Sequence, residues 1–143
     1  MDIRVMGLDD YESVYALWSS TAGMGLRSLD DSYDGIARFL KRNPSTNFVA
    51  LENDKIIGVI LCGHDGRRGY IYHTAVEPIC RKRGIGRVLL DKTLEALQKE
   101  GINKVALVVF ATNESGNAFW EKMGFSERVD LIYRNKSINP DNA

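Results

Sequence analysis

The sequence predicts an α/β domain in which helices cover both faces of a mixed, mostly antiparallel sheet of six to seven strands. Two observations predict this fold. Helix-like and strand-like segments follow one another in the order β-α-α-β-β-β-α-β-α-β. The long helical segment at residues 83–100 lies between two strand-like segments, and such a unit is expected to form a right-handed crossover. Because 143 residues suffice for one core, residues 1–143 are predicted to form a single domain.

The first segments predict a strand and a helix. Residues 2–6 have the pattern of a short strand. Asp9 or Asp10 can cap a helix that runs to about Ser20, because a side-chain oxygen at that position accepts from a free backbone N–H. Apolar residues recur at helical spacing behind this cap: Tyr11, Val14, Tyr15, Leu17 and Trp18.

A loop and a second helix follow. Residues 21–28 contain two glycines and are predicted to form a loop. Asp30 or Asp31 begins the next helix. Pro44 ends it, since the residue before a proline disfavours the helical conformation.

Three consecutive strands are predicted in the middle of the chain. Residues 47–52 and 55–63 are apolar segments joined by Asn53-Asp54, which is a hairpin signal. Residues 64–69 form the next turn, where His64 and Asp65 are interpreted as turn-forming residues. Residues 70–76 form the following strand.

The main helix and a buried strand come next. The helix at residues 83–100 is closed by Gly101, at a position where a left-handed residue is usual. Residues 103–110 are nearly all apolar, which is typical of a central strand covered on both faces.

The C-terminal segments predict a short helix and the last strands. The helix spans residues 113–123 and ends at Gly124. Phe125 and residues 129–133 supply the last strands, and the polar residues 136–143 are expected to fray.

Composition favours a cytoplasmic protein without nucleic-acid or membrane partners. The formal net charge is zero, which speaks against an RNA-binding module built around the basic residues. The longest apolar stretch, residues 56–63, is far shorter than the roughly 20 residues of a membrane span. The N-terminus lacks the pattern of a signal peptide. Cys62 and Cys80 lack the spacing of metal ligands, so no metal is expected; Cys62 is interpreted as a buried apolar residue, and no role is assigned to Cys80.

A basic turn with glycines stands where a predicted strand ends and the main helix begins. Its sequence is Arg81-Lys82-Arg83-Gly84-Ile85-Gly86-Arg87. The first turn of a helix has unpaired backbone N–H groups and the positive end of the helix dipole. Glycines allow a ligand to approach the backbone closely. The turn therefore predicts a phosphate or pyrophosphate site.

The residues around this turn resemble the acetyl-coenzyme-A motif of the GCN5-related N-acetyltransferase (GNAT) family. The matching run is Ala75-Val76-Glu77-Pro78-x-x-Arg81-x-x-Gly84-Ile85-Gly86-x-x-Leu89-Leu90. A second run resembles the downstream motif of that family: Asn113-x-x-Gly116-x-x-Phe119-Trp120-Glu121-Lys122-x-Gly124-Phe125. The resemblance in element order extends over nearly the whole chain, and residues 70–90 have some similarity to ribosomal-protein-alanine acetyltransferases.

The resemblance implies acetyl-coenzyme A as cosubstrate, held where two central strands splay apart. The backbone of Ala75 and Val76 would pair with the pantetheine arm, Asn113 would contact that arm, and Phe119 and Trp120 would lie beside the cofactor. The pyrophosphate would be held by the amides of the basic turn: Arg81, Lys82, Arg83, Gly84, Ile85, Gly86 and Arg87. The implied activity is direct acetyl transfer to a primary amine, on a small molecule or a peptide N-terminus.

Three positions depart from the pattern of the family. The tyrosine that often protonates the leaving thiolate is replaced by Trp120, whose indole N–H is not a usable acid. The usual glutamates correspond to Val108 and Tyr70. Two interpretations stay open. Catalysis can rest on positioning and on polarisation of the carbonyl, or the chain is a non-catalytic acyl-coenzyme-A binder.

Tyr72 and His73 are the candidate catalytic residues. A phenol can donate a proton and an imidazole can accept one. A packed, structural role stays open for Tyr72, and for His73 it is the preferred interpretation. Strand alternation predicts two faces, with Tyr70, Tyr72 and Thr74 on one and Ile71, His73 and Ala75 on the other. This favours Tyr72 as the group that handles the proton.

The acceptor is expected to lie between the first two helices, their loop and the last strands. Candidate residues there are Trp18, Met24, Arg27, Tyr33 and Tyr133, with Trp18 interpreted as core. The loop at residues 21–31 can act as a lid. Its acidic neighbours either attract a cationic amine or cap the second helix: Asp30, Asp31 and Asp34. A homodimer is left open.

Overall fold

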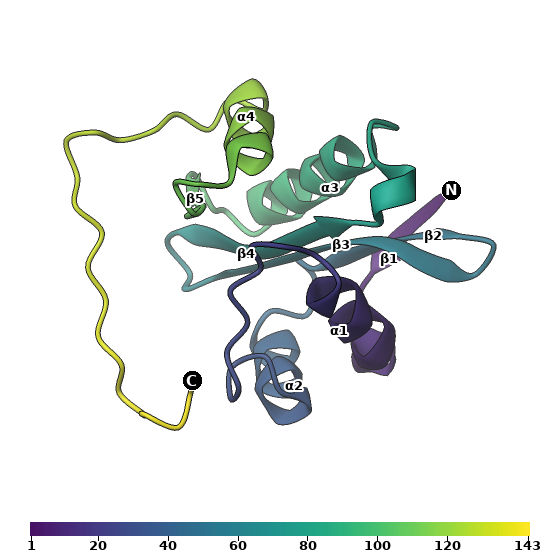
Figure 1. The fold of residues 1–143 in the computed structure, drawn as a ribbon, viewed down its shortest axis with the longest axis horizontal. Helices are drawn as coiled ribbons and strands as arrows, with labels where there is room; N and C mark the ends of the chain where they lie inside the picture. Colours follow the sequence, from purple (N-terminus) through teal and green to yellow (C-terminus); the bar gives the residue numbers. More distant parts are fainter.

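A computed structural model describes residues 1–143 and places one mixed sheet at the centre of the molecule (Figure 1). The strand order is β1-β2-β3-β4-β5; the first four strands pair antiparallel, and β5 is parallel to β4. The bounds are β1 (Asp2–Val5), β2 (Phe48–Glu52), β3 (Lys55–His64), β4 (Gly69–Val76) and β5 (Val105–Ala106). The predicted mixed sheet is confirmed, with five strands and not six to seven.

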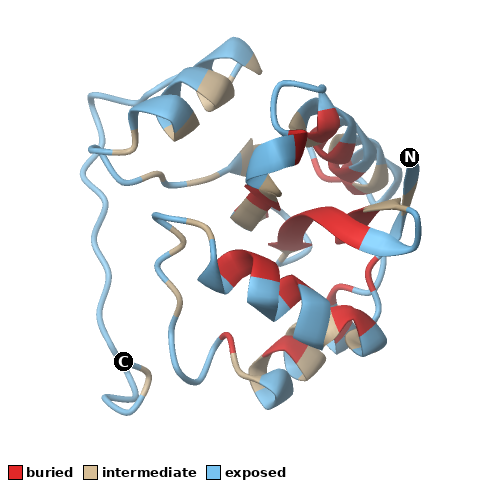
Figure 2. Ribbon diagram, turned by 45° about the vertical axis from the view of Figure 1, so that its right-hand side comes forward, coloured by how far each residue is buried: buried red, intermediate tan, exposed pale blue.

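Helices cover both faces of the sheet, as predicted (Figure 1). One face carries α1 (Tyr11–Ser19) and α2 (Tyr33–Arg42); the other carries α3 (Ile85–Lys99) and α4 (Glu114–Lys122). Single turns of 3-10 helix, η1 (Leu8–Asp10) and η2 (Pro78–Cys80), precede α1 and α3. Figure 2 shows the buried residues concentrated between the sheet and its helices. No helix is both long and apolar enough to cross a membrane.

Of the two helices before β2, only α2 has a side-chain cap, because Asp10 stands at the start of α1 without accepting from an amide of that helix. The Asp10 carboxylate accepts hydrogen bonds from the guanidinium of Arg4, at 2.7 Å and 2.8 Å, and from the Gly7 amide at 2.9 Å. The bonds to Arg4 lower the pKa of Asp10 below its ordinary value. At α2 the cap is Ser32, whose hydroxyl accepts from the Gly35 amide at 3.0 Å; neither Asp30 nor Asp31 serves as that cap.

The chain after α4 does not form the predicted last strands. Neither Phe125 nor residues 129–133 belong to the sheet, and the tail runs as an extended segment beside the domain (Figure 1). Its apolar side chains, among them Val129 and Ile132, are exposed. A strand needs a partner edge, and β5 is too short to offer one. The apolar pattern of the tail therefore predicted a buried strand, but the sheet has no edge against which these residues could be buried.

The end of this tail is hydrogen-bonded to the loop before α2. The Asn142 side-chain oxygen accepts from the amides of Leu29 and Asp30 at 3.0 Å and 2.9 Å. The Ala143 carbonyl accepts from the Ser28 amide at 2.9 Å. The C-terminal residues for which fraying was predicted are thus attached to the α1/α2 side of the domain.

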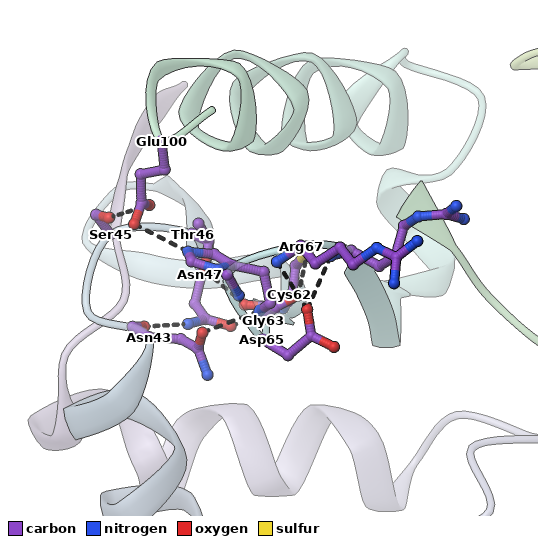
Figure 3. Close-up of polar contacts among 12 residues, drawn as sticks. Asn43, Ser45, Thr46, Asn47, Cys62, Gly63, Asp65, Arg67 and Glu100 are labelled. Atoms are coloured by element: carbon purple, nitrogen blue, oxygen red, sulfur yellow. Dashed lines mark hydrogen bonds and ion pairs between the residues drawn. The ribbon is translucent and has the colours of Figure 1, made fainter. Parts of the chain in front are cut away.

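A buried polar network ties the loop after α2 to β3 (Figure 3). The Asn47 side chain is fully buried; its amide donates to the Asn43 carbonyl at 2.8 Å, and its oxygen accepts from the Cys62 backbone at 2.7 Å. Thr46 donates to the Cys62 carbonyl at 2.7 Å. Burial raises the pKa of the Cys62 thiol to about 12, so this side chain is an inert apolar residue, as predicted.

The turn between β3 and β4 uses His64 and Asp65 structurally, as predicted. Asp65 accepts from the amides of Arg67 and Arg68, both at 2.8 Å (Figure 3). The His64 ring accepts from the Gly66 amide at 2.9 Å through Nδ1, which leaves Nε2–H to donate to a Glu100 carboxylate oxygen at 2.9 Å. The network fixes the end of the sheet at the β3–β4 turn.

Replacing Asn47 with alanine should destabilise the fold strongly. The change leaves the buried Cys62 N–H and Asn43 carbonyl without partners, and each orphaned group costs roughly 1–3 kcal/mol. The free energy of unfolding in urea should fall by about 2–4 kcal/mol. Ser45→Ala is the matched control, because it removes only an exposed hydroxyl from Glu100 and should change the free energy by less than about 1 kcal/mol. Equal effects would contradict the structural role of Asn47.

Candidate functional site

A cleft opens where β4 and β5 separate. The two strands pair only at Gly69–Val105 and Tyr70–Ala106, so no strand occupies the outer edge of β4 between residues 71 and 76. The cleft has a volume of about 1910 Å³ and is lined by β4, the turn between η2 and α3, α4 and the loop after α1. Ordinary small-molecule pockets measure roughly 300–1,000 Å³. The cleft is therefore large enough for a long ligand that lies against the free edge of β4.

The turn before α3 presents a series of free backbone N–H groups to this cleft. No amide from Lys82 to Arg87 donates a hydrogen bond within the protein. Lys82 has φ +65° and Gly84 has φ +79°, and these left-handed residues curl the turn so that successive amides converge. At Gly84 a side chain would be strained, which accounts for the glycine. Unpaired, converging amides of this kind are the usual partners of an anion, so phosphate binding at the turn stays a prediction.

The basic side chains of the turn divide into two groups. Lys82 and Arg87 line the cleft and form no ion pair. Arg81 also lines the cleft, and its Nε donates to the Val76 carbonyl at 3.2 Å. Arg83 does not line the cleft. Its guanidinium pairs with Glu52 of β2, and this pairing raises the pKa of Arg83. Only the backbone amide of Arg83 is then left to bind an anion.

Phe119 of α4 covers the first turn of α3. A Cβ at Gly86 would stand 3.1 Å from the Phe119 ring, so this glycine lets α4 pack against α3. Trp120 packs edge-on to Phe119 at 4.9 Å between centroids and to Phe125 at 5.2 Å. Both Phe119 and Trp120 line the cleft. The predicted aromatic neighbours of a cofactor are thus beside the anion site.

Asn113 caps α4 and faces the loop after α1. Its Oδ1 accepts from the Gly116 amide at 3.0 Å, so the Nδ2 group is the part left for a ligand. A Cβ at Gly23 would lie 3.5 Å from that Nδ2, and one at Gly25 would lie 3.4 Å from the ring of Phe110. The loop predicted as a lid therefore reaches across the cleft to the chain before α4.

A β-bulge in β4 carries the two candidate catalytic residues. Ile71 and Thr74 of β4 pair with β3 residues that are only two positions apart, so Tyr72 and His73 together face the single residue Leu61. Such an extra residue breaks the alternation of side chains and re-aims one of them. The sequence pattern gives no indication of this bulge.

Tyr72 and His73 consequently lie on the same face of the sheet. The Tyr72 ring meets Phe39 of α2 at 5.6 Å between centroids, and the His73 ring meets Trp18 of α1 at 4.9 Å. Ile71, which alternation placed with His73, packs on the α3 side. The prediction that Tyr72 and His73 occupy opposite faces is wrong, and with it the reason for preferring Tyr72.

His73 forms a buried pair with Asp31. His73 Nε2 lies 2.8 Å from Asp31 Oδ1, and the two side chains are only 13% and 7% exposed. Asp31 Oδ2 accepts from the Arg27 amide at 2.7 Å, which fixes the carboxylate. With Nε2–H donated to a carboxylate, Nδ1 of a neutral ring is the free basic nitrogen; it has no partner in the protein. Both residues line the cleft. Sequence reasoning missed Asp31 in this role.

Tyr72 is half exposed at the cleft, and its hydroxyl makes no hydrogen bond within the protein. Partial burial, together with the nearby negative charge of Asp30, raises the pKa of its phenol. Tyr72 therefore stays protonated at neutral pH and is a hydrogen-bond donor. Its environment also includes Tyr70, at 4.7 Å between ring centroids, and Tyr133 of the tail.

The remaining predicted residues divide between cleft and core. Met24, Arg27, Tyr133 and Val108 line the cleft. Trp18 is fully buried, as predicted, and Tyr33 is exposed outside the cleft. Sequence reasoning missed three cleft residues of α2: Arg38, Phe39 and Arg42. Their spacing on one helix face is the signal that points to them. No cluster of three potential metal ligands is present.

Comparisons with known proteins agree with this architecture. The model of the acetyltransferase (GNAT) family matches residues 11–125. An acetyltransferase of Pectobacterium atrosepticum is 34% identical over 141 residues, which cover 99% of this chain and 98% of that protein.

Two solved structures share the fold. The ribosomal-protein-S18-alanine N-acetyltransferase of Escherichia coli superposes with a TM-score of 0.75 at 24% identity, covering 99% of this chain and 86% of that one. The PaiA N-acetyltransferase of Thermoplasma acidophilum, solved in complex with coenzyme A, gives a TM-score of 0.73 at 19% identity, covering 85% and 87%.

Proposed function

The chain belongs to the acetyltransferase (GNAT) family, and from this premise we propose that it transfers an acetyl group from acetyl-coenzyme A to a primary amine. One observation carries the proposal. The unpaired amides from Lys82 to Arg87 stand at one end of a cleft that continues along the free edge of β4 to the His73–Asp31 pair. An anionic cofactor can be bound at one end while its thioester reaches a base at the other.

The cofactor is proposed to lie across the cleft in an extended form. Its pyrophosphate is held by the amides before α3, with Lys82 and Arg87 supplying charge-assisted contacts. Its pantetheine arm pairs with the backbone of Ala75 and Val76 as an added strand would. The Val76 carbonyl is released for this pairing when the Arg81 guanidinium leaves it.

The thioester end of the cofactor is proposed to meet the acceptor at the β4 bulge. The amine nitrogen attacks the thioester carbon; a carbon–nitrogen bond forms, the carbon–sulfur bond breaks, and the amine loses one proton while the thiolate gains one. His73 Nδ1 takes the amine proton, because Asp31 holds the opposite nitrogen as a donor. Tyr72, which shares this face and stays protonated, donates to the sulfur. Trp120 then needs no acid role.

Coenzyme-A binding should depend on Arg87 but not on Arg83. Both are arginines of the same turn, but only Arg87 lines the cleft, whereas Arg83 is paired with Glu52. Arg87→Ala should raise the dissociation constant of coenzyme A by roughly 10–100-fold, the value of a hydrogen bond to a charged group. Titration calorimetry and the rise of melting temperature with ligand measure it.

Arg83→Ala is the matched control, and it should leave the dissociation constant within about threefold of the parent. If both substitutions weaken binding equally, the anion does not lie where the amides converge. If coenzyme A binds but no amine of any class is acetylated, the chain is a non-catalytic acyl-coenzyme-A binder. This is the alternative raised by the replacement of the family's usual acid and bases.

A further inference from the structure

Three arginines on the α1/α2 side of the cleft have no partner. Arg27 of the loop and Arg38 and Arg42 of α2 all line the cleft. None takes part in an ion pair, and none of their guanidinium groups makes a hydrogen bond within the protein. Arg38 and Arg42 are four residues apart, so they project from one face of α2 about 6 Å apart along its axis.

Two carboxylates line the cleft on the same side, Asp30 and Asp31, and both are hydrogen-bonded. Asp31 is bound to His73 and to the Arg27 amide. Asp30 accepts from the Asn142 side chain at 2.9 Å, as part of the attachment of the C-terminus. These donors are uncharged and do not cancel the charges of the two carboxylates, but three arginines against two aspartates leave the lining of this side positive by one charge, although the chain as a whole has no net charge.

Aromatic rings stand beside these cations. Phe39 lies between Arg38 and Arg42 in the sequence of α2 and meets the edge of Tyr72, which in turn packs against Tyr70. Phe39, Tyr70 and Tyr72 all line the cleft. This side thus combines an apolar surface, two forked cations on one helix face, and the His73 base.

From this arrangement we propose that the acceptor is an amine that also carries an anionic group, a carboxylate or a phosphate. The proposal rests on the proposed acetyl transfer and names the acceptor class of the same site. Arg38 and Arg42 bind the anion, since the planar guanidinium matches carboxylate and phosphate oxygens in pairs. The amine of the acceptor is then directed towards His73. Polycationic acceptors are disfavoured, because the net charge of this side of the cleft is positive, as theirs is.

Matched pairs of acceptors test this proposal with saturating acetyl-coenzyme A. L-phenylalanine and phenethylamine differ by a carboxylate, glucosamine 6-phosphate and glucosamine by a phosphate, and spermidine represents the polycations. The anionic member of at least one pair should have a kcat/KM roughly tenfold or more above its partner and above spermidine. The pair that responds identifies the anion as carboxylate or phosphate.

The double variant Arg38→Ala/Arg42→Ala should remove this preference, mainly by raising KM. Arg67→Ala/Arg68→Ala is the matched control. It deletes two neighbouring exposed arginines in the β3–β4 turn that do not line the cleft, so the preference should persist. A preference for the neutral or polycationic acceptors, or one that survives loss of Arg38 and Arg42, would overturn the proposal.

Binding of the acetylated products separates this proposal from acetyl transfer itself. N-acetyl-L-phenylalanine or N-acetylglucosamine 6-phosphate should bind the coenzyme-A-loaded protein, and the Arg38→Ala/Arg42→Ala variant should lose that binding. If this occurs while no amine is acetylated, the anion site stands and the transfer activity fails. If both members of each pair are acetylated equally well, the activity stands and the anion site is wrong. Absence of binding by both products also overturns the anion site.

Discussion

Replacing His73 with glutamine should lower kcat by about 10²–10⁴-fold, the usual contribution of a general base. Glutamine retains a polar group for Asp31 but has no basic nitrogen to take the amine proton. The acidic limb of the kcat/KM profile, which reports deprotonation of the base in the free enzyme, should disappear. The dissociation constant of coenzyme A should stay nearly constant, because the anion site is at the other end of the cleft.

The chain has one other histidine, which supplies the control. His64 lies in the β3–β4 turn and is bound to Gly66 and Glu100, outside the cleft. His64→Gln should reduce stability modestly and leave kcat and its pH profile unchanged. A profile that keeps its acidic limb in His73→Gln would show that the base is another group.

Asp31→Asn separates the orienting role of the carboxylate from the base itself. An asparagine that still accepts from the Arg27 amide through its one oxygen turns its NH₂ group towards His73 Nε2, which favours the tautomer whose proton is on Nδ1. We expect kcat to fall by roughly tenfold or more while the dissociation constant of coenzyme A stays nearly constant. An unchanged kcat would show that Asp31 only packs the loop against β4.

Several local elements of the fold follow from local sequence patterns, and the structure confirms these within a few residues. The central strand predicted at residues 103–110 is wrong, because only Val105–Ala106 pairs with β4 and the side chains of Val108 and Phe110 are exposed. The hairpin strands and the main helix occupy Phe48–Glu52, Lys55–His64 and Ile85–Lys99, against predicted ranges 47–52, 55–63 and 83–100. Apolar periodicity and turn residues determine these elements within a short window. The basic turn was predictable for the same reason, since its glycines and its place before a helix are adjacent in the sequence.

The features that escaped prediction depend on partners far away along the chain. The β4 bulge is defined by its register with β3, and His73 meets Asp31 across 42 residues. Arg83 is withdrawn from the anion site by Glu52, 31 residues before it. The strand predicted at residues 129–133 does not form. The spacing of apolar residues indicates which side chains a segment can bury, but not whether a sheet edge is present to pair with it.

Tyr72→Phe should lower kcat by roughly 10²-fold while leaving coenzyme-A binding nearly unchanged, if the phenol protonates the departing thiolate. The change removes only a hydroxyl that has no hydrogen bond in the protein, so the ring contacts with Phe39 and Tyr70 persist. Because the pKa of Tyr72 is raised, its proton is present throughout the neutral range. The alkaline limb of the wild-type kcat profile should therefore begin only above the ordinary tyrosine value of about 10, and the variant should lack it.

Tyr33→Phe is the matched control for the hydroxyl, because Tyr33 is exposed outside the cleft, and it should leave kcat unchanged. Acetyl donors that release a less basic thiolate give a second test. With a thioester of an acidic thiol in place of coenzyme A, the departing thiolate needs no proton, so the defect of Tyr72→Phe should shrink while that of His73→Gln remains. If both defects persist with the acidic thiol, Tyr72 acts on the amine or the carbonyl and not on the sulfur.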